Sequence, residues 1–288
     1  GLSEEELIPR IGDYDGLAVR PPTKAPAAVL EAGGKGRLRV VGRAGIGVDN
    51  IDVAAATANG IVVMNTPYGN AVTTAEHAIA MMFSVARQIP AADRSTQAGK
   101  WEKSTFMGQE LSGKTLGVIG CGNIGSIVCD RAQGLRMKVI AYDPFLSADR
   151  AKDLGVDKVE LEELLGRADI ITLHVPLTDQ TRGMLDAKAL AKCRKGVLII
   201  NCARGGLVVE SDLKTALEAG QVGGAALDVF EVEPAYENPL FGTPNLSCTP
   251  HLGASTAEAQ ENVALQVAEQ MSDYLLDGAV VIALNMPS

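Results

Sequence analysis

The chain has 288 residues and 47% of them are hydrophobic, which is enough for two packed cores, so we expect two α/β domains. Its formal net charge of -9 argues against a nucleic-acid partner, because binding a phosphate backbone takes a net or local excess of Lys and Arg. A membrane partner is not expected either, since no apolar run approaches the length that spans a bilayer and the start, Gly1–Glu6, is acidic where a signal peptide is basic.

A smaller α/β segment comes first along the chain. A buried helix is predicted after it, at Thr74–Val85, because this stretch is apolar at almost every turn. We expect its Met81 and Met82 to fill the core and the helix to form part of a hinge. The predicted strands of the first segment are Gly16–Arg20, Val40–Gly42 and Ile61–Met64.

From Lys114 onward, short apolar runs alternate with helical stretches, as a buried parallel sheet requires. This alternation predicts right-handed crossovers and a doubly wound sheet. An amphipathic stretch, Ala257–Leu276, follows and is expected to return to the first segment. The predicted strands of the sheet are Thr115–Ile119, Lys138–Tyr142, Ile170–His174, Val197–Asn201, Gly224–Asp228 and Leu246–Thr249.

A glycine-rich sequence, Gly120-Cys121-Gly122-Asn123-Ile124-Gly125, lies between a predicted strand and a predicted helix. The next strand ends in Asp143, eighteen residues after Gly125. In this context the motif predicts dinucleotide binding, with the pyrophosphate at the helix N-terminus and the ribose hydroxyls at Asp143, rather than a structural glycine turn. NAD is favoured over NADP, because no Arg follows Asp143 to neutralise a 2′-phosphate.

Three polar residues follow the ends of different predicted strands: Arg204, Glu233 and His251. Ligands of open α/β sheets bind at these carboxyl ends, so we expect the three side chains to meet there. Hydride transfer leaves a hydroxyl proton to remove, and His251 suits that role, with Glu233 raising its pKa. Arg204 can bind a carboxylate and polarise a carbonyl. The structural alternatives are a C-terminal cap for His251, a surface charge for Glu233 and a structural ion pair for Arg204.

The remaining histidines and the cysteines give weaker signals. His77 is expected to be a satisfied core or interface residue, and His174 a structural or cofactor-contacting one. Trp101 is expected at a subunit interface or in a surface cluster. No histidine has metal-binding spacing, so we expect no metal site. The five cysteines lack a Cys-x-x-Cys pair, which favours neither a zinc site nor a disulfide framework and indicates a reducing cytoplasm.

Taken together, these motifs resemble those of the D-isomer-specific 2-hydroxyacid dehydrogenase family over nearly the whole chain. The resemblance implies an α/β fold with two Rossmann-like domains: a doubly wound NAD-binding domain at residues 71–253, and a smaller flavodoxin-like substrate domain at 1–70 and 254–288 that lacks its first strand. It rests on the dinucleotide motif and on Gly42–Asn50, Asn65-Thr66-Pro67, Gly69-Asn70, Asn201–Gly206, Ala226–Phe230 and Pro250–Thr256.

The resemblance also implies roles for individual residues and an assembly that is a homodimer through the NAD domains or a tetramer. Arg204, Glu233 and His251 are its catalytic residues. Its NAD contacts are Gly120, Gly122, Asn123, Ile124, Gly125, Asp143, His174, Val175, Pro176, Cys202, Ala203, Asp228, Gly253 and Ala254. The expected substrate contacts are Arg20, Lys24, Arg43, Gly45, Ile46, Asn70, Arg204 and His251.

The chain departs from the family pattern at two positions and at both ends. Ile46 stands where Thr is frequent, and Asn123 where Arg is frequent beside the pyrophosphate, so a polar contact and the affinity for NAD are expected to be weaker. The segment Gly1–Ser3 resembles the part of the family sequence just after its second strand. In the family pattern about thirty residues, roughly one βαβ unit, come before this point. Ala283–Ser288 resembles a sequence after which longer members continue into regulatory domains.

The leading expectation is oxidation of D-3-phosphoglycerate to 3-phosphohydroxypyruvate with NAD, the entry to serine synthesis. Arg20, Lys24 and Arg43 would bind the phosphate and carboxylate of this substrate. The same three catalytic residues could instead serve another small 2-hydroxy acid, such as glycerate or lactate. An NAD-sensing corepressor or scaffold of the same fold is an alternative from another functional class, and a fragment that binds NAD without turnover is a third.

Overall fold

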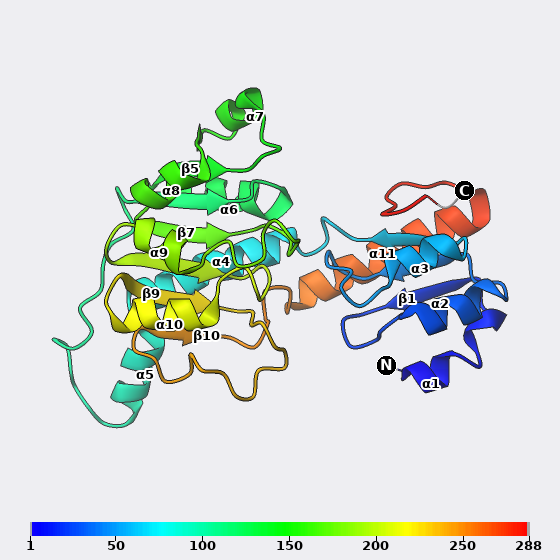
Figure 1. Ribbon diagram of the computed structural model, residues 1–288, viewed down its shortest axis with the longest axis horizontal. Helices are drawn as coiled ribbons and strands as arrows, with labels where there is room; N and C mark the ends of the chain where they lie inside the picture. Colours follow the sequence, from blue (N-terminus) through cyan, green and yellow to red (C-terminus); the bar gives the residue numbers. More distant parts are fainter. Residues whose placement is uncertain (1, 287–288) are drawn as a thin grey trace. The chain divides into compact units, whose positions relative to one another are not determined.

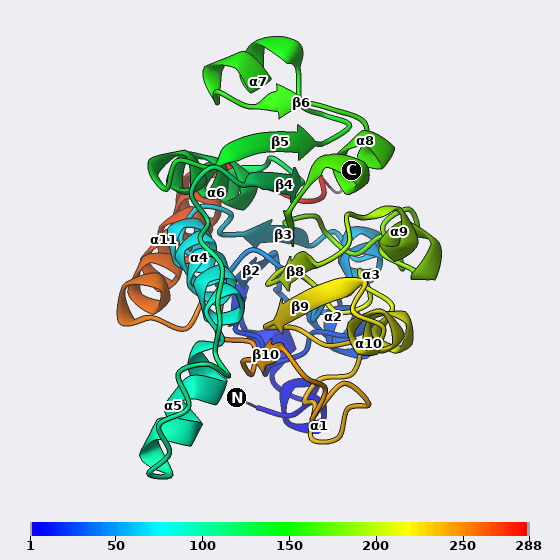
Figure 2. The same cartoon turned by 90° about the vertical axis from the view of Figure 1, so that its left-hand side faces the viewer.

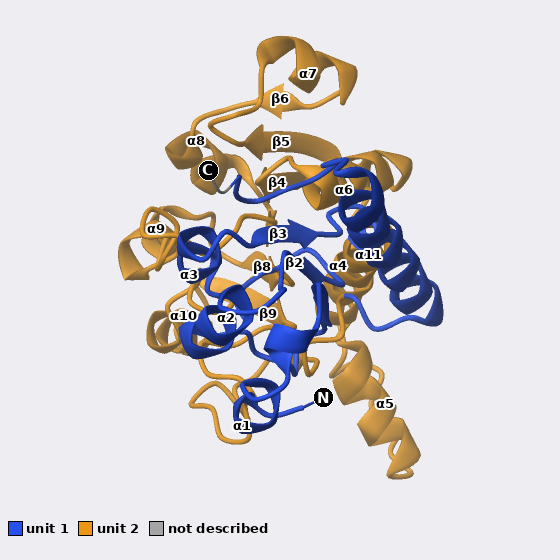
Figure 3. Ribbon diagram, turned by 90° about the vertical axis from the view of Figure 1, so that its right-hand side faces the viewer, with its two compact units in different colours: residues 1–71, 254–288 blue, residues 72–253 orange. Residues whose placement is uncertain are grey.

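The computed structural model of the protein describes residues 2–286; Gly1, Pro287 and Ser288, which belong to the chain ends discussed above, lie outside the described residues. The chain folds into two compact units (Figures 1 and 3). Unit 1 consists of Gly1–Ala71 and Ala254–Ser288, and unit 2 of Val72–Gly253. Each unit contains its own parallel sheet.

Unit 2 is built on a seven-stranded sheet in the order β10-β9-β8-β7-β4-β5-β6, and every pairing in it is parallel. The order reverses at β4, so the sheet is doubly wound, which confirms the predicted α/β fold class. The strands are β4 Thr115–Ile119, β5 Lys138–Tyr142, β6 Asp157–Lys158, β7 Ile170–Leu173, β8 Val197–Asn201, β9 Val222–Leu227 and β10 Leu246–Cys248.

Helices cover both faces of this sheet. Successive strand residues point to opposite faces, so Leu198 and Ile200 of β8 pack in one core and Val197 and Ile199 in the other. The first core also holds α4, α6 and α7, and the second α8, α9 and α10; α5 lies beyond the β10 edge (Figure 2). The helices are α4 Ala71–Ala86, α5 Ile89–Gln97, α6 Asn123–Gly134, α7 Ala148–Asp153, α8 Leu161–Arg167, α9 Ala187–Lys192 and α10 Glu210–Glu218.

The α4 helix extends beyond the predicted Thr74–Val85 at both ends. Met81 is 4% exposed and Met82 is fully buried, which confirms that they fill the core. The strands predicted to end at His174, Asp228 and Thr249 each stop one residue earlier. His174, Asp228 and Thr249 are thus the first residues beyond the strand ends.

Unit 1 holds a three-stranded parallel sheet in the order β1-β2-β3, with β1 Gly16–Val19, β2 Val40–Arg43 and β3 Val62–Asn65. Val41 and Val63 pack with the short helices α1 Glu4–Leu7, η1 Ile11–Asp13, α2 Ala27–Gly34 and α3 Val53–Ala58. The helix α11, Ala257–Asp277, packs on the opposite face through Val267 and Met271. The predicted return of this stretch to the first segment is therefore confirmed.

The close packing of α11 on the three-stranded sheet depends on Gly42 of β2. A Cβ added to Gly42 in β2 would lie 2.5 Å from Val267 Cγ2 and against the Met271 side chain. Real Cβ contacts are not that short, so a larger residue at position 42 would displace the Met271 and Val267 side chains of α11. Within residues 2–286, the helices are too short or too polar to serve as a membrane span.

Candidate active site

The dinucleotide motif forms the turn between β4 and α6. Gly120 follows β4 with a φ of 93°, in the left-handed region that favours glycine. Its N–H donates to Tyr142 O at 2.9 Å, which ties the turn to the end of β5. A Cβ added to Gly125 in α6 would lie only 1.9 Å from Gly120 O, so the helix approaches the turn as closely as backbone contact allows.

Asp143 is held by backbone amides next to this turn. Its Oδ2 accepts from Cys121 N at 2.8 Å and its Oδ1 accepts from Phe145 N at 2.8 Å. The carboxylate is thereby fixed at the end of β5, immediately beside the glycine turn. This is the relation that binding of a phosphate and an adjoining ribose requires.

The residues of the turn fit a dinucleotide. A Cβ added to Gly122 would meet no atom of the described residues within 4 Å, so this position faces open space. Gly122 is also the N-cap of α6, and among residues 2–286 no side chain caps the helix there. Open space at a glycine and an uncapped helix N-terminus are what an incoming pyrophosphate needs.

Arg204 lies in the turn after β8, whose shape is set by Asn201. The Asn201 side chain accepts from Ala203 N at 3.0 Å and donates to Arg204 O at 2.9 Å. The Arg204 guanidinium donates to Ala203 O at 2.7 Å. A Cβ added to Gly205 would overlap Phe230 O, so the Arg204 turn packs against the chain leaving β9.

Glu233 and His251 meet at the same edge of the sheet. Glu233 Oε2 lies 2.6 Å from His251 Nδ1, and Glu233 Oε1 accepts from Phe230 N at 2.9 Å. The structure thus brings together the pair predicted from the strand ends. With Nδ1 held by the carboxylate, Nε2 is the ring nitrogen that can exchange a proton with a substrate.

The contact between Glu233 and His251 shifts their pKa values in opposite directions. The hydrogen bond that His251 donates to Glu233 raises the pKa of His251 above its ordinary value of 6.5, while burial and the nearby Arg204 charge act the other way. Burial alone would raise the pKa of Glu233, but the hydrogen bonds from His251 and Phe230 N outweigh it and lower that pKa. Glu233 is therefore a carboxylate near neutral pH, and His251 can be protonated or neutral there.

Asp228 holds the turn that carries His251. It is fully buried at the end of β9, and its carboxylate accepts from Leu252 N and Gly253 N, both at 2.7 Å. His251 N donates to Asp228 O at 2.9 Å, and His251 takes a left-handed φ of 55°. This backbone conformation is uncommon outside glycine, so the contacts with Asp228 hold His251 in place.

Two residues that carried no catalytic prediction complete this network. Thr249 Oγ1 donates to Asp228 Oδ1 at 2.6 Å, and His77 Nε2 of α4 lies 3.1 Å from Thr249 Oγ1 and 3.3 Å from Asp228 Oδ1. His77 is thus a satisfied histidine, as predicted. Its link to the His251 turn was not predicted, because a lone histidine in an apolar helix shows no partner in sequence.

Two further predicted NAD contacts lie in buried surroundings. His174 Nε2 lies 2.9 Å from Thr172 Oγ1, while its enclosed Nδ1 has no hydrogen-bond partner among the described residues. Burial lowers the pKa of His174 to about 4, so this ring is neutral near pH 7. Burial raises the pKa of the Cys202 thiol, helped by the nearby Asp228. Neither side chain suits proton transfer, and their contact with NAD stays a prediction.

Unit 1 holds the other predicted substrate residues. Arg20 and Lys24 are exposed, and Asn50 Nδ2 donates to Arg20 O and Thr23 O, which shapes the loop between them. Arg43 is buried, and its guanidinium donates to Asn50 Oδ1 at 3.2 Å and to Ala44 O. The guanidinium folds over Gly45, where a Cβ would lie closest to Arg43 Nη1. The roles of Arg43, Gly45, Ile46 and Asn70 in substrate binding stay predictions.

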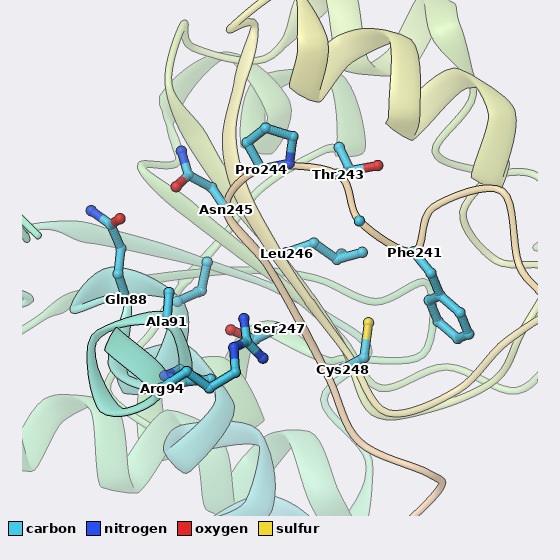
Figure 4. A pocket seen from close by; sticks show the side chains of 13 residues that line it. Gln88, Ala91, Arg94, Phe241, Thr243, Pro244, Asn245, Leu246, Ser247 and Cys248 are labelled. Atoms are coloured by element: carbon cyan, nitrogen blue, oxygen red, sulfur yellow. The ribbon is translucent and has the colours of Figure 1, made fainter. Parts of the chain in front are cut away.

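A separate pocket lies between α5 and the segment that leads into β10 (Figure 4). It has a volume of about 430 Å³, and its lining includes Arg94, Phe241 and Cys248. None of the predicted catalytic or NAD-binding residues lines it. In the part of the chain that the structure describes, no cluster of three or more His, Cys, Asp or Glu side chains could hold a metal ion.

Comparison with known proteins identifies the family. The family model described as "D-isomer specific 2-hydroxyacid dehydrogenase, NAD binding domain" matches residues 79–253, which is more than half of the chain. The chain belongs to this family. Unit 2, with its glycine turn and Asp143, is accordingly an NAD-binding Rossmann domain, as predicted.

Individual relatives agree with this assignment. The chain is 50% identical over 287 residues to a D-3-phosphoglycerate dehydrogenase of Synechocystis sp., covering all of this chain and 51% of the relative. The corresponding Bacillus subtilis protein is 49% identical over 275 residues, covering 96% of this chain and 52% of the relative. The chain spans about half the length of the curated relatives it matches. A solved glyoxylate reductase from Paecilomyes thermophila matches with a TM-score of 0.90 at 32% identity, covering 98% of this chain and 89% of that one.

Proposed function

We propose that the protein oxidises D-3-phosphoglycerate to 3-phosphohydroxypyruvate with NAD, as an early step of serine synthesis. The observation that carries the proposal is the 2.6 Å contact between Glu233 and His251 at the carboxyl edge of a sheet that also bears the dinucleotide turn. The D-3-phosphoglycerate dehydrogenases to which the chain is about half identical support the choice of substrate.

The proton of the substrate hydroxyl passes to His251 Nε2. Glu233 holds the opposite ring nitrogen and stabilises the imidazolium that forms, because its own lowered pKa keeps it a carboxylate. When bound, NAD supplies the acceptor for the hydride of the carbinol carbon. Arg204 binds the substrate carboxylate and stabilises charge on the oxygen that becomes the carbonyl.

The phosphate of the substrate distinguishes it from glycerate and lactate. We assign phosphate binding to unit 1, where Arg20 and Lys24 are exposed cations on either side of a loop ordered by Asn50. A phosphate needs such concentrated positive charge in a chain whose net charge is -9. An unphosphorylated 2-hydroxy acid would need only the carboxylate contact with Arg204.

The assembly we propose is a homodimer formed through the NAD domains, or a tetramer built from such dimers. None of the described residues of α5 is buried, and Trp101, shortly after this helix, is 79% exposed. Exposed aromatic side chains of this kind are typical of interface cores. We place the protein in a reducing cytoplasm, since all five cysteines are free thiols.

The direct test is NADH formation by the protein with NAD and D-3-phosphoglycerate, D-glycerate or D-lactate. We expect turnover with phosphoglycerate to exceed the other two by roughly 100-fold or more in kcat/KM, since two charged contacts are lost without the phosphate. Arg20→Ala should remove most of that preference. Arg37→Ala is the matched control, because Arg37 is an exposed arginine of the same unit paired with Asp15. Equal turnover of all three substrates would contradict the phosphate assignment.

A further inference from the structure

Two cysteines meet behind the dinucleotide turn. Cys121 is the second residue of the glycine motif, and Cys129 lies on α6, about two helical turns further along. Their Sγ atoms are 3.8 Å apart, and both side chains are buried in the core between α6 and the sheet. A disulfide has an S–S distance of about 2.05 Å, so the sulfurs need to approach by less than about 2 Å to bond.

The two thiols are not equivalent. The hydrogen bond from Cys129 lowers the pKa of Cys121, against the opposing effects of burial and the Asp143 charge. The same contact, together with burial, raises the pKa of Cys129. Burial raises the pKa of Cys193 and of Cys248 to about 11. Cys121 is therefore the cysteine best able to form a thiolate, which is the reactive species in thiol oxidation.

Access to Cys121 favours a small reagent. Its side chain is 9% exposed, whereas Cys129 is fully buried. The neighbouring Gly122 faces open space, so a small molecule can reach the turn from that side. A bulky disulfide such as oxidised glutathione would have to enter the core to reach the same sulfur.

We propose that Cys121 and Cys129 are a redox modification site, at which a peroxide converts the two thiols to a disulfide that joins the dinucleotide turn to α6 and weakens NAD binding. The Cys121 thiolate attacks a peroxide oxygen, the O–O bond breaks and hydroxide leaves, which gives a sulfenic acid. The Cys129 thiol then attacks this sulfur; the S–S bond forms, the S–OH bond breaks and water leaves. Two thiols and one hydrogen peroxide thus give one disulfide and two waters.

The disulfide affects NAD because the Gly120 end of the turn is packed tightly against α6. Drawing Cys121 toward α6 strains the hydrogen bond from Cys121 N to Asp143 Oδ2, which positions the ribose-binding carboxylate. It also presses Gly120 against Gly125 of α6. These two residues are already so close that a Cβ on Gly125 would overlap Gly120 O. The inference rests on NAD binding by unit 2 and does not depend on the identity of the substrate.

The test exposes the full chain to hydrogen peroxide, with and without saturating NAD. Free thiols are counted by alkylation and mass spectrometry, and the affinity for NAD is measured by calorimetry. We expect reversible loss of two of the five thiols, mapped to a Cys121–Cys129 peptide. We also expect binding of NAD to weaken by at least about tenfold, the loss of one hydrogen bond to a charged group, and to recover with dithiothreitol. Bound NAD should slow the oxidation.

Variants separate this site from general oxidation. Cys129→Ala keeps a small apolar side chain in the core and should bind NAD without showing the reversible loss. Cys193→Ala, a buried cysteine in the other core of unit 2, should respond as the unchanged protein does. A full chain that keeps all five thiols, a disulfide that leaves NAD affinity unchanged, or a Cys129→Ala variant with the same reversible loss would each overturn the proposal. Failure of the reduced protein to bind NAD would count against the proposed function instead.

Discussion

His251 Nδ1 and Glu233 Oε2 lie 2.6 Å apart, and this hydrogen bond joins the segments that leave two adjacent strands, β9 and β10. The two residues are separated by 18 positions in the chain. The contact therefore exists only because the sheet places the carboxyl ends of both strands at one edge. It fixes which ring nitrogen faces a substrate and in which direction the pKa of the imidazole moves.

The pH profile of turnover depends on this pair. Oxidation needs neutral His251, so kcat/KM for NADH formation should rise with pH through a pKa above 6.5. In Glu233→Gln the largest cause of the raised pKa is removed, and the rising limb should move to lower pH. The measurement is kcat/KM from about pH 5 to about pH 10 for both proteins. A limb at the same pH in both would show that Glu233 does not act on His251.

The pair also makes stability depend on pH. Because the folded-state pKa of His251 is raised, its stabilisation is complete below 6.5 and is lost as pH rises through the folded value. Because the pKa of Glu233 is lowered, its stabilisation is present above 4.5 and is lost as pH falls through the folded value. Denaturant unfolding should therefore show the largest difference between the unchanged protein and Glu233→Gln between these two values. A difference in the free energy of unfolding that keeps growing toward alkaline pH would contradict the raised pKa of His251.

Two glycines of the dinucleotide turn should respond differently to alanine. Gly125→Ala puts a Cβ 1.9 Å from Gly120 O, so it should lower the free energy of unfolding by about 1–3 kcal/mol as well as weaken NAD binding. Gly122→Ala meets nothing within 4 Å among the described residues and has a negative φ, so stability should change little while NAD binding weakens. Thermal unfolding and NAD titration of both variants check this. Tight NAD binding by Gly122→Ala would show that the pyrophosphate does not bind at this turn.

We expect Asp228 to position His251, although Asp228 is not one of the proposed catalytic residues. Asp228→Asn keeps one acceptor oxygen and replaces the other by an NH₂ group, so the side chain can no longer accept from Thr249 and Leu252 N at one oxygen and from Gly253 N at the other. We expect a loss of about 1–3 kcal/mol in the free energy of unfolding, together with a lower kcat. His77→Gln keeps a polar partner for Thr249 and should have a smaller effect on both. An Asp228→Asn variant with unchanged stability would show that this carboxylate does not hold the turn.

Much of unit 2 was predictable because its strands are short apolar runs with clear ends. The predicted bounds of β4, β5 and β8 agree with the structure, since Gly120 and Asp143 follow the first two runs and the polar Asn201 ends the third. The two-residue strand β6 was missed, because Asp157 and Lys158 are exposed and polar and only their backbone pairs with β5. The helix α5 was missed as well, since it is polar on average and none of its described residues is buried in a core.

The contact between Glu233 and His251 was easier to predict than the hydrogen bonds around it. Strand ends indicated Arg204, Glu233 and His251, because parallel strands gather their carboxyl ends at one edge. The link from His77 through Thr249 to Asp228 could not be predicted, since it joins α4 to distant loops by side-chain contact alone. The Cys121–Cys129 contact was equally hidden, because a spacing of eight residues is not a recognised cysteine motif.

We propose that His251 accepts the proton released when the protein oxidises D-3-phosphoglycerate with NAD. The most direct measurement compares NADH formation by the unchanged protein and by His251→Gln, with NAD affinity determined on the same samples. We predict a fall in kcat of about 10²- to 10⁴-fold with NAD affinity nearly unchanged. Unchanged turnover in His251→Gln would contradict the account, because the proton would then be leaving by another group.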